Sequence, residues 1–225
     1  MGTRRKLNRF KLVMPRPETI EKYVSTYPAK QLYHQPEQLP PITAQQIFHN
    51  SQPLIFDFGC GRGEFIVRQA LDHPTYNFIG VDYHWKSLLD GVNRAHEHRL
   101  ENIHFIRADL RWLLRCIPDQ SSHTVYLLFP PPIKRAKYAK NDVFTTAFIQ
   151  DVHRILRHDG TFHFVTDIAP YFDRKMALVD KLGLLTRVTL QQSFEGGLTW
   201  YQKVWESHGL PSLRVVYVKD KPYQS

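Results

Sequence analysis

Residues 54–63 constrain the fold more than any other stretch of this 225-residue chain. They read Leu-Ile-Phe-Asp-Phe-Gly-Cys-Gly-Arg-Gly, an apolar run that leads into three glycines at alternating positions. The apolar run predicts a buried strand, and the apolar residues at helical spacing after it predict a helix over about 63–72. Strand, glycine-rich turn and helix form the first unit of a nucleotide-binding α/β domain, in which the glycines let the backbone approach a ligand closely.

The spacing of the glycines limits the class of ligand. A dinucleotide-binding loop has the pattern G-x-G-x-x-G and directs a helix N-terminus at a pyrophosphate. Here Asp57 lies inside the strand end, two residues before Gly59, and Gly61 and Gly63 follow. The carboxylate of Asp57 would repel a diphosphate, but it could hold the ammonium group of S-adenosylmethionine (SAM), which carries no phosphate. A tight turn without a ligand is the alternative for the glycines alone.

Two more aspartates follow predicted strands. Asp82 ends the apolar run 77–81, and Asp109 comes after the run 103–107. The carboxyl ends of parallel strands form the ligand crevice of an open α/β sheet, and an acidic residue about 20 positions after the glycine loop can accept hydrogen bonds from ribose hydroxyls. A helix N-cap is the alternative role for any one of them. Together, Asp57, Asp82 and Asp109 resemble the pattern of the class I SAM-dependent methyltransferases.

Strands and helices alternate over the rest of the chain. Further strands are predicted near 124–129, 161–165, 185–190 and 212–218, and helices near 42–50, 85–99, 110–116, 141–157 and 170–182. This alternation predicts an α/β, Rossmann-like class I methyltransferase fold with a seven-stranded, mostly parallel sheet and helices on both faces. We expect residues 42–225 to form this domain and residues 1–41 to form a basic N-terminal arm and an irregular extension.

The charge of the chain indicates an acidic partner. The formal net charge is +9 and the isoelectric point is about 9.6, which favours a nucleic acid over ordinary solubility charge. No apolar run reaches the roughly 20 residues of a membrane span, and the basic N-terminus lacks the apolar core of a signal peptide. Two cysteines and twelve histidines show no metal-ligand spacing. These features predict a cytoplasmic protein without membrane or metal, with its histidines on the surface.

The loop after the predicted strand at 124–129 is the natural place for catalysis, because it leaves the same sheet edge as the glycine loop. It begins with Phe129-Pro130-Pro131-Pro132 and continues into a basic run that contains a tyrosine. The charged and aromatic residues of that run are Lys134, Arg135, Lys137, Tyr138 and Lys140. Such a run suits phosphate contacts and base stacking, and a solvated charge run is the alternative.

Over about residues 50–200 the sequence resembles the bacterial tRNA (guanine-N(7)-)-methyltransferase family. That family has an F-P-D-P-W loop after its fourth strand, a Thr-Asp pair after the fifth, and a T-x-(F/Y)-E segment near the C-terminus. Thr166-Asp167 matches the second motif, and 192–195 (Gln-Ser-Phe-Glu) keeps the aromatic and acidic residues of the third. The resemblance implies SAM as the cofactor and tRNA as the partner. Its implied cofactor-binding residues are Asp57, Gly59, Gly61, Asp82, Asp109 and Phe129.

The first motif of the family is altered in this chain. Pro131 stands where the family has its presumed catalytic Asp, Ile133 where it has Trp, and Arg135 where it has Lys. The resemblance implies that Arg135 and Asp167 act at the reacting base, and the implied substrate contacts are Arg135, Asp167, Gln192, Phe194 and Glu195. A helix N-cap is the alternative for Asp167, and an ordinary surface residue is the alternative for Glu195.

Three functions are consistent with the sequence. The first is SAM-dependent methylation of a guanine ring nitrogen in tRNA, for which positioning matters more than base catalysis because that nitrogen carries a lone pair and no proton. The second is N-methylation of a small heterocyclic molecule, motivated by the altered loop. The third is an RNA-binding relative without catalysis, motivated by Pro131.

Overall fold

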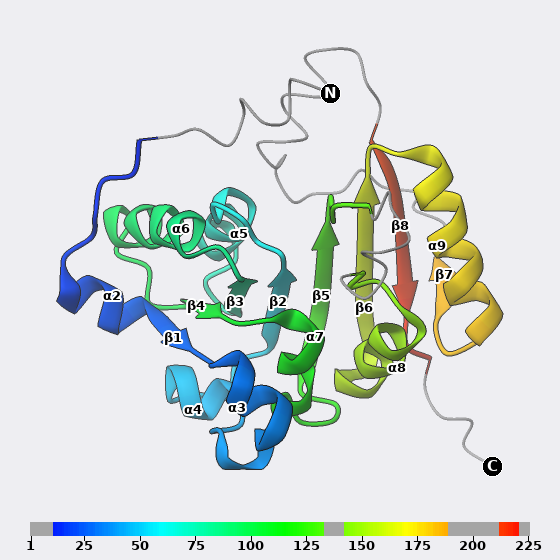
Figure 1. Cartoon of the computed structure of the whole chain (residues 1–225), viewed down its shortest axis with the longest axis horizontal. Coiled ribbons are helices and arrows are strands. Elements are labelled where there is room, and N and C mark those ends of the chain that lie inside the picture. Colours follow the sequence, from blue (N-terminus) through cyan, green and yellow to red (C-terminus); the bar gives the residue numbers. More distant parts are fainter. Residues whose placement is uncertain (1–10, 133–141, 189–211, 221–225) are drawn as a thin grey trace.

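The computed structural model describes residues 11–132, 142–188 and 212–220. In these ranges the chain forms one eight-stranded sheet with helices on both faces (Figure 1). The strands are β1 (Val24–Thr26), β2 (Leu54–Phe58), β3 (Asn77–Asp82), β4 (Ile103–Arg107), β5 (Ser122–Leu128), β6 (Leu156–Thr166), β7 (Thr186–Val188) and β8 (Leu213–Val218). The helices are α2 (Pro17–Tyr23), α3 (Ala29–His34), α4 (Ala44–Phe48), α5 (Glu64–Asp72), α6 (Trp85–Glu97), α7 (Leu110–Leu113), α8 (Thr146–Ile155) and α9 (Ala169–Leu182), with 3-10 turns η1 (Pro36–Gln38) and η2 (Leu114–Cys116).

The strand order is β1-β4-β3-β2-β5-β6-β8-β7. All pairings from β1 to β6 are parallel, and β8 runs antiparallel to both β6 and β7. From β2 the chain builds the sheet outward through β3 and β4, and from β5 it builds in the other direction. The point between β2 and β5 is therefore the topological switch point, where open α/β sheets bind their ligands.

The α/β class and the mostly parallel sheet are confirmed, whereas the predicted number of seven strands is wrong. The additional strand is β1, which lies in the segment predicted to be irregular. Its three residues pair with β4 on one side only, so β1 is an edge strand. A strand this short carries no alternating pattern by which the sequence could reveal it.

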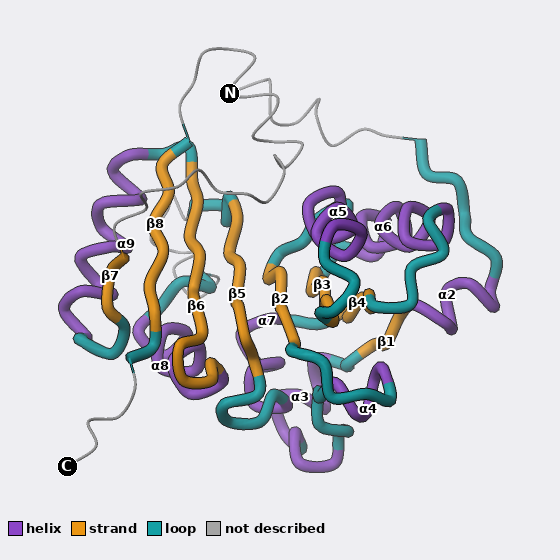
Figure 2. Tube along the Cα trace, turned by 180° about the vertical axis from the view of Figure 1, so that it is seen from behind, coloured by secondary structure: helices purple, strands orange, loops and turns teal. Residues whose placement is uncertain are grey.

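The segment 17–42 wraps around the β4 edge of the sheet (Figure 2). Helix α2 packs beside α6 on one face, where the Tyr23 hydroxyl donates to the Leu100 carbonyl at 2.8 Å. After β1 the chain reaches the other face, where Leu32 of α3 is fully buried and the amide of Ile42 donates to the Cys116 carbonyl at 2.8 Å. This segment thus contributes to the core on both faces of the sheet.

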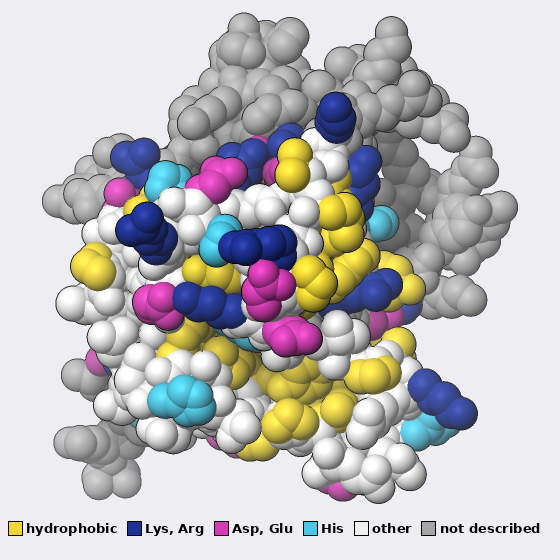
Figure 3. Space-filling view, turned by 90° about the vertical axis from the view of Figure 1, so that its left-hand side faces the viewer, with side chains coloured by type: hydrophobic (Ala, Val, Ile, Leu, Met, Phe, Trp, Pro, Cys, Tyr) yellow, Lys and Arg dark blue, Asp and Glu magenta, His cyan; other side chains and the backbone are white. Residues whose placement is uncertain are grey.

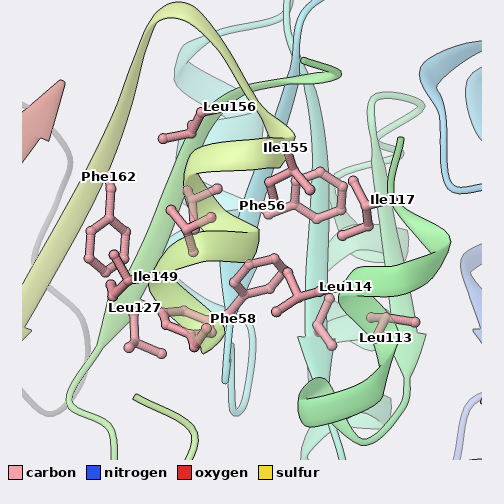
Figure 4. Packing of buried hydrophobic residues seen from close by; sticks show 14 of the residues in the cluster. Phe56, Phe58, Leu113, Leu114, Ile117, Leu127, Ile149, Ile155, Leu156 and Phe162 are labelled. Carbon is pink, nitrogen blue, oxygen red and sulfur yellow. The ribbon is translucent and has the colours of Figure 1, made fainter. Parts of the chain in front are cut away.

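The two faces of the sheet form two hydrophobic clusters. Helices α5 and α6 cover the first face, where Ile66 and Val92 pack against Ile55 and Phe105 of the strands. Helices α7, α8 and α9 cover the second. The close-up in Figure 4 shows side chains of the second face. Its labelled residues include Phe56, Phe58, Leu113, Leu114, Ile117, Leu127, Ile149, Ile155 and Phe162.

The structure differs from the sequence-based predictions at three places, each for a physical reason. Strand β6 starts at Leu156 rather than at 161. Its pairing with β5 is irregular near Asp159, which has a φ of 61°, and this irregularity lets one strand continue through the predicted turn. Helix α8 starts at 146 rather than near 141, because the Thr145 side chain caps it by accepting from the Phe148 amide. His104 is buried against Ser25 at 2.9 Å, so the prediction of surface histidines is wrong there.

Among the described helices, none combines the length and the apolar character that crossing a bilayer requires.

Candidate active site

The glycine loop follows β2 at the carboxyl edge of the sheet. Gly59, Gly61 and Gly63 have φ angles of +80°, +56° and +70°, a left-handed conformation that side chains with a Cβ rarely adopt. The amides of Gly59 and Cys60 donate to the Val81 carbonyl at 2.8 and 3.0 Å, which holds the loop against β3. A Cβ at Gly59 or Gly61 would meet no described atom within 4 Å. The loop therefore turns sharply and leaves open space above it.

Asp82 at the end of β3 supports this loop. One carboxylate oxygen accepts from the Gly61 amide at 2.9 Å, and the other accepts from the His84 amide at 2.8 Å. The residue is only partly buried, so its oxygens keep lone pairs that can accept from a ligand. The sequence prediction that Asp82 and the glycine loop meet at one strand edge is confirmed in this geometry.

Asp57 lies beneath the same loop and is 2% exposed. Its Oδ1 atom has no hydrogen-bond partner among the described residues. Burial first, and the nearby charge of Asp82 second, raise the pKa of the Asp57 carboxyl from 3.8 to about 8. A buried carboxyl with an unsatisfied oxygen is costly unless a partner arrives, and a cationic ligand would supply that partner.

Two partly buried groups beside Asp57 were not predicted from the sequence. Tyr126 of β5 is the direct register partner of Asp57, and its ring lies 4.9 Å from that of Phe65 on α5. Burial and the charge of Asp57 raise the pKa of the Tyr126 phenol, while burial, Asp82 and Asp57 raise the pKa of the Cys60 thiol. Both groups therefore stay neutral next to the Asp57 carboxyl. Strand alternation limits which residues share a face, but only the register of two strands reveals this pairing.

An ion-pair network anchors the loop to α6, and the sequence reading missed it. The Arg62 guanidinium donates from Nε to Asp90 at 2.8 Å. Arg94 in turn lies 3.3 Å from Asp90 and 3.2 Å from Glu64. These side chains are between 15% and 35% exposed, which screens them less than fully exposed pairs. The network ties Arg62, in the middle of the glycine loop, to α6.

Asp109 takes the helix N-cap role that was the alternative for its sequence position. Its carboxylate accepts from the Arg111 amide at 3.1 Å and so caps α7. It also accepts from Nε of the same arginine at 2.9 Å, and this contact lowers the pKa of the Asp109 carboxyl. The preceding residue, Ala108, donates its amide to the Asp82 carbonyl at 3.2 Å, so Asp109 stands at the same edge as Asp82. Its binding of a cofactor stays a prediction.

The carboxyl ends of β5 and β6 lie side by side. Phe129 has a φ of 52°, which is strained for a bulky residue, and its amide donates to the Val165 carbonyl at 2.8 Å. Thr166 is fully buried, and its Oγ1 has no partner among the described residues. Asp167 follows directly, and Ile168 rather than Asp167 occupies the N-cap position of α9. The structure therefore brings Phe129 and Asp167 to one corner of the edge.

Four predicted substrate residues lie outside the described residues: Arg135, Gln192, Phe194 and Glu195. The same holds for Ile133 and the basic run after Pro132. In the described ranges, no group of three or more His, Cys, Asp or Glu side chains could hold a metal ion.

The described part of the site fits SAM. The unsatisfied oxygen of Asp57 suits a cationic group, and the open space over Gly59 and Gly61 suits close approach of a ligand to the backbone. Asp82 offers acceptors for ribose hydroxyls one strand away. This donor set is poorly suited to a dinucleotide, since two carboxylates would face a pyrophosphate.

Solved structures of methyltransferases share the fold. The aminoglycoside resistance methyltransferase NpmB1 superposes with a TM-score of 0.56 at 17% identity, over 79% of this chain and 94% of that one. A 16S rRNA (adenine(1408)-N(1))-methyltransferase variant from Catenulisporales acidiphilia, solved with SAM as cosubstrate, gives 0.53 at 13% identity, over 78% and 89%. Identities this low establish the fold alone.

Sequence relatives are more similar. The tRNA (guanine-N(7)-)-methyltransferase of Rubrobacter xylanophilus is 36% identical over 221 residues, which are 96% of this chain and 99% of the relative. The enzyme of the same name from Chloroflexus aggregans is 33% identical over 98% of this chain and 100% of the relative. A family model described as "Putative methyltransferase" matches residues 51–209. The chain thus belongs to the methyltransferase family that contains these tRNA (guanine-N(7)-)-methyltransferases.

Proposed function

We propose that the protein transfers the methyl group of SAM to N7 of a guanine in tRNA. The observation that carries the proposal is the unsatisfied, buried carboxyl oxygen of Asp57 beneath the open glycine loop and beside Asp82. This arrangement suits a ligand in which a cationic group is attached to a nucleoside. The relatives named tRNA (guanine-N(7)-)-methyltransferase, which match nearly the whole chain, supply the acceptor.

Bound SAM supplies an electrophilic methyl group on its sulfonium. In the proposed complex, Asp57 ionises and pairs with the ammonium of the methionine moiety. The glycine loop lies close to the ligand because Gly59 and Gly61 have no Cβ. Asp82 accepts from ribose hydroxyls while it keeps the Gly61 amide in place.

The acceptor atom demands little proton chemistry. Guanine N7 has a lone pair and no proton, so no general base has to act before the methyl group moves. The rate then depends on holding N7 in line and about 3 Å from the methyl carbon. We propose that Asp167, directly after β6, accepts from guanine N–H groups, a contact worth roughly 1–3 kcal/mol. The resemblance adds Arg135, Gln192, Phe194 and Glu195 to these acceptor contacts.

Pro131 is compatible with this mechanism. Pro130, Pro131 and Pro132 restrict the backbone directly after the strained Phe129, and none of them has a backbone N–H. A stiff segment at this point limits how far the wall of the site can move during methyl transfer. We therefore propose that orientation by the surrounding wall replaces the carboxylate that the family has at this position.

The partner and the location follow from the same proposal. The net charge of +9 suits a polyanionic substrate. A protein that modifies tRNA acts where tRNA is, so we propose a cytoplasmic location.

The test is methyl transfer from labelled SAM to bulk tRNA taken from cells that lack guanine-N(7) methylation. We expect label in the tRNA with the wild-type protein and a loss of at least tenfold with Asp57→Asn. Lys181→Gln, an exposed change at the far end of α9, serves as the control and should retain full activity. A protein that binds SAM but leaves every tRNA pool unlabelled would contradict the proposal.

A small heterocyclic acceptor is the second candidate, and Pro131 favours it because the family loop is altered there. The same assay with free guanosine, guanosine monophosphate and a small-molecule extract separates the two candidates. An RNA enzyme labels intact tRNA far more strongly than its nucleosides, whereas a small-molecule enzyme does the reverse. Binding of tRNA without label in any pool would leave the non-catalytic relative.

A further inference from the structure

A cluster of aromatic and basic side chains lies on the surface beside the cofactor edge, outside the site described above. We call it the Tyr33 cluster; its members are Lys30, Tyr33, His34, Trp112 and Arg115. The Tyr33 ring makes T-shaped contacts with the rings of Trp112 and His34, with 4.8 Å between the ring centroids in each pair. The Arg115 guanidinium lies over the Trp112 ring at 5.0 Å. Helix α3 and the α7–η2 segment thus present one continuous aromatic and cationic surface.

The elements that carry the cluster start next to the carboxyl end of β4, two strands from the glycine loop after β2. The amide of Tyr27, which precedes α3, donates to the Arg107 carbonyl at the end of β4 at 3.0 Å. Trp112 belongs to α7, whose N-cap is Asp109. A large ligand that reaches the cofactor site and extends along α7 would therefore meet the cluster as well.

The positive charges of the cluster have no acidic ion-pair partner in the part of the chain that the structure describes. Among the described residues, neither Lys30 nor Arg115 has a carboxylate partner within ion-pair distance. The face formed by α2 and α6 is different: Figure 3 shows basic and acidic side chains interleaved over it. There Lys22 pairs with Glu101, and Arg94 pairs with Asp90. An uncompensated pair of cations beside aromatic rings is available for an anionic partner.

Folding does not require the exposed part of the cluster. Leu32, fully buried, and Tyr27, 6% exposed, already fix α3 to the core. Tyr33 by contrast remains 52% exposed, so much of its ring is free to contact another molecule. Trp112 packs partly on the core and serves as a rigid base for both Tyr33 and Arg115.

The surface next to the cluster is hollowed and polar. An open hollow of about 690 Å³ lies along α3 and is lined by Pro28, Lys30, Gln31, His34 and Gln35. The hollow is open, and amide, imidazole and ammonium groups line it together with apolar atoms such as those of Pro28. Such a lining suits the sugar–phosphate backbone of RNA better than an apolar ligand.

We propose that the Tyr33 cluster is a second contact surface for the tRNA, on which an unpaired base stacks against Tyr33 while Lys30 and Arg115 bind the flanking phosphates. This inference rests on the proposed function for the identity of the RNA. Aromatic rings interleaved with cations bind single-stranded nucleic acid because every base has a stacking face and every nucleotide a charge. The cluster positions the substrate and takes no part in the methyl transfer.

The test measures tRNA affinity as a function of salt, together with SAM affinity, in matched variants. Tyr33→Ala should weaken tRNA binding by roughly tenfold or more, and Tyr33→Phe should retain it, because stacking needs the ring and not the hydroxyl. The double variant Lys30→Gln/Arg115→Gln should lower the slope of log K against log salt by roughly 1.5, for two lost phosphate contacts. All of these variants should bind SAM as the wild type does, which shows that the site is intact.

The control is the double variant Arg157→Gln/Lys181→Gln. It removes the same charge from two exposed positions at the start of β6 and the end of α9, in the half of the sheet that β1 and β4 do not form. An equal loss of affinity in this control, or unchanged affinity in the cluster variants, would overturn the inference. If the wild type methylates tRNA and the cluster variants bind it normally, this inference fails alone. If the wild type binds no tRNA, the proposed function fails with it.

Discussion

Replacing Asp57 by Asn should stabilise the ligand-free protein at neutral pH while it weakens SAM binding. In the folded protein burial and Asp82 raise the pKa of the Asp57 carboxyl to about 8, whereas in the unfolded chain its pKa is near 3.8. Between these values the unfolded chain has released the proton and the folded protein has kept it. The folded state therefore binds more protons, and its stability falls as pH rises through this window.

The magnitude follows from the width of that window. Each pH unit between the two pKa values is worth about 1.36 kcal/mol, so the full window corresponds to roughly 5–6 kcal/mol. An Asn at position 57 has no such dependence, although its buried amide costs about 1–3 kcal/mol at every pH. From pH 5.5 to 7.5 the wild type should lose about 2–3 kcal/mol relative to Asp57→Asn, which corresponds to roughly 5–10 °C in Tm.

The assay is urea unfolding of both proteins at several pH values between 5.5 and 7.5, without SAM. Asp109→Asn is the matched control, because Arg111 lowers the pKa of the Asp109 carboxyl and the group stays ionised over this range. The wild-type stability minus that of Asp109→Asn should not change with pH. If the wild-type stability minus that of Asp57→Asn is also independent of pH, the reasoning is refuted, since Asp57 would then be ionised before any ligand binds.

Three further predictions concern the same edge and the helix that supports it. Gly61→Ala forces a left-handed residue and places a methyl group in the open space above the loop, so we expect about 1 kcal/mol lower stability and at least tenfold weaker SAM binding by calorimetry. Asp82→Asn turns an amide donor toward one of two backbone N–H groups, and should weaken SAM binding about tenfold or more, whereas unchanged affinity would remove Asp82 from the site. Lys175→Met leaves the Asp142 carboxylate without its 2.7 Å partner and should lower the unfolding free energy by about 3 kcal/mol in urea titrations. The added change Asp142→Asn should restore part of it, and no rescue would contradict the pairing.

The cofactor half of the site could be predicted because its signals are local in the sequence. Gly59 and Gly61 lie within four residues of Asp57, and Asp82 ends the very next strand. Parallel strands end at one edge, so a residue at a strand end can be placed without knowing any contact. The left-handed φ angles of the glycines agree with what their alternate spacing predicts.

The remaining features of the site depend on contacts between distant parts of the chain. Tyr126 faces Asp57 only because β5 pairs with β2 in one particular register. Arg62 of the glycine loop meets Asp90 of α6, 28 positions later in the chain, and no motif links the two residues. A charged residue has several possible ion-pair partners, and the sequence alone does not indicate which of them it contacts in the folded protein.

The edge of the sheet was the least predictable part of the fold. The short β1 forms only because β4 offers it an unpaired edge. Its Ser25 hydrogen-bonds to His104, and nothing in the sequence around His104 distinguishes it from a surface histidine. Burial lowers the pKa of His104 to about 4, so it stays neutral where a surface histidine would titrate. Tertiary context decides both features.

The most direct test of the account identifies the methylated nucleoside. Guanine-N(7)-deficient tRNA is incubated with the protein and labelled SAM, digested to nucleosides, and separated by chromatography coupled to mass spectrometry. The account predicts that the label appears as N7-methylguanosine, which would show that the edge built from Asp57, Asp82 and the glycine loop supports the family reaction with Pro131 in the catalytic loop. Label in a methylated adenosine, or in no nucleoside while SAM binds, would contradict it.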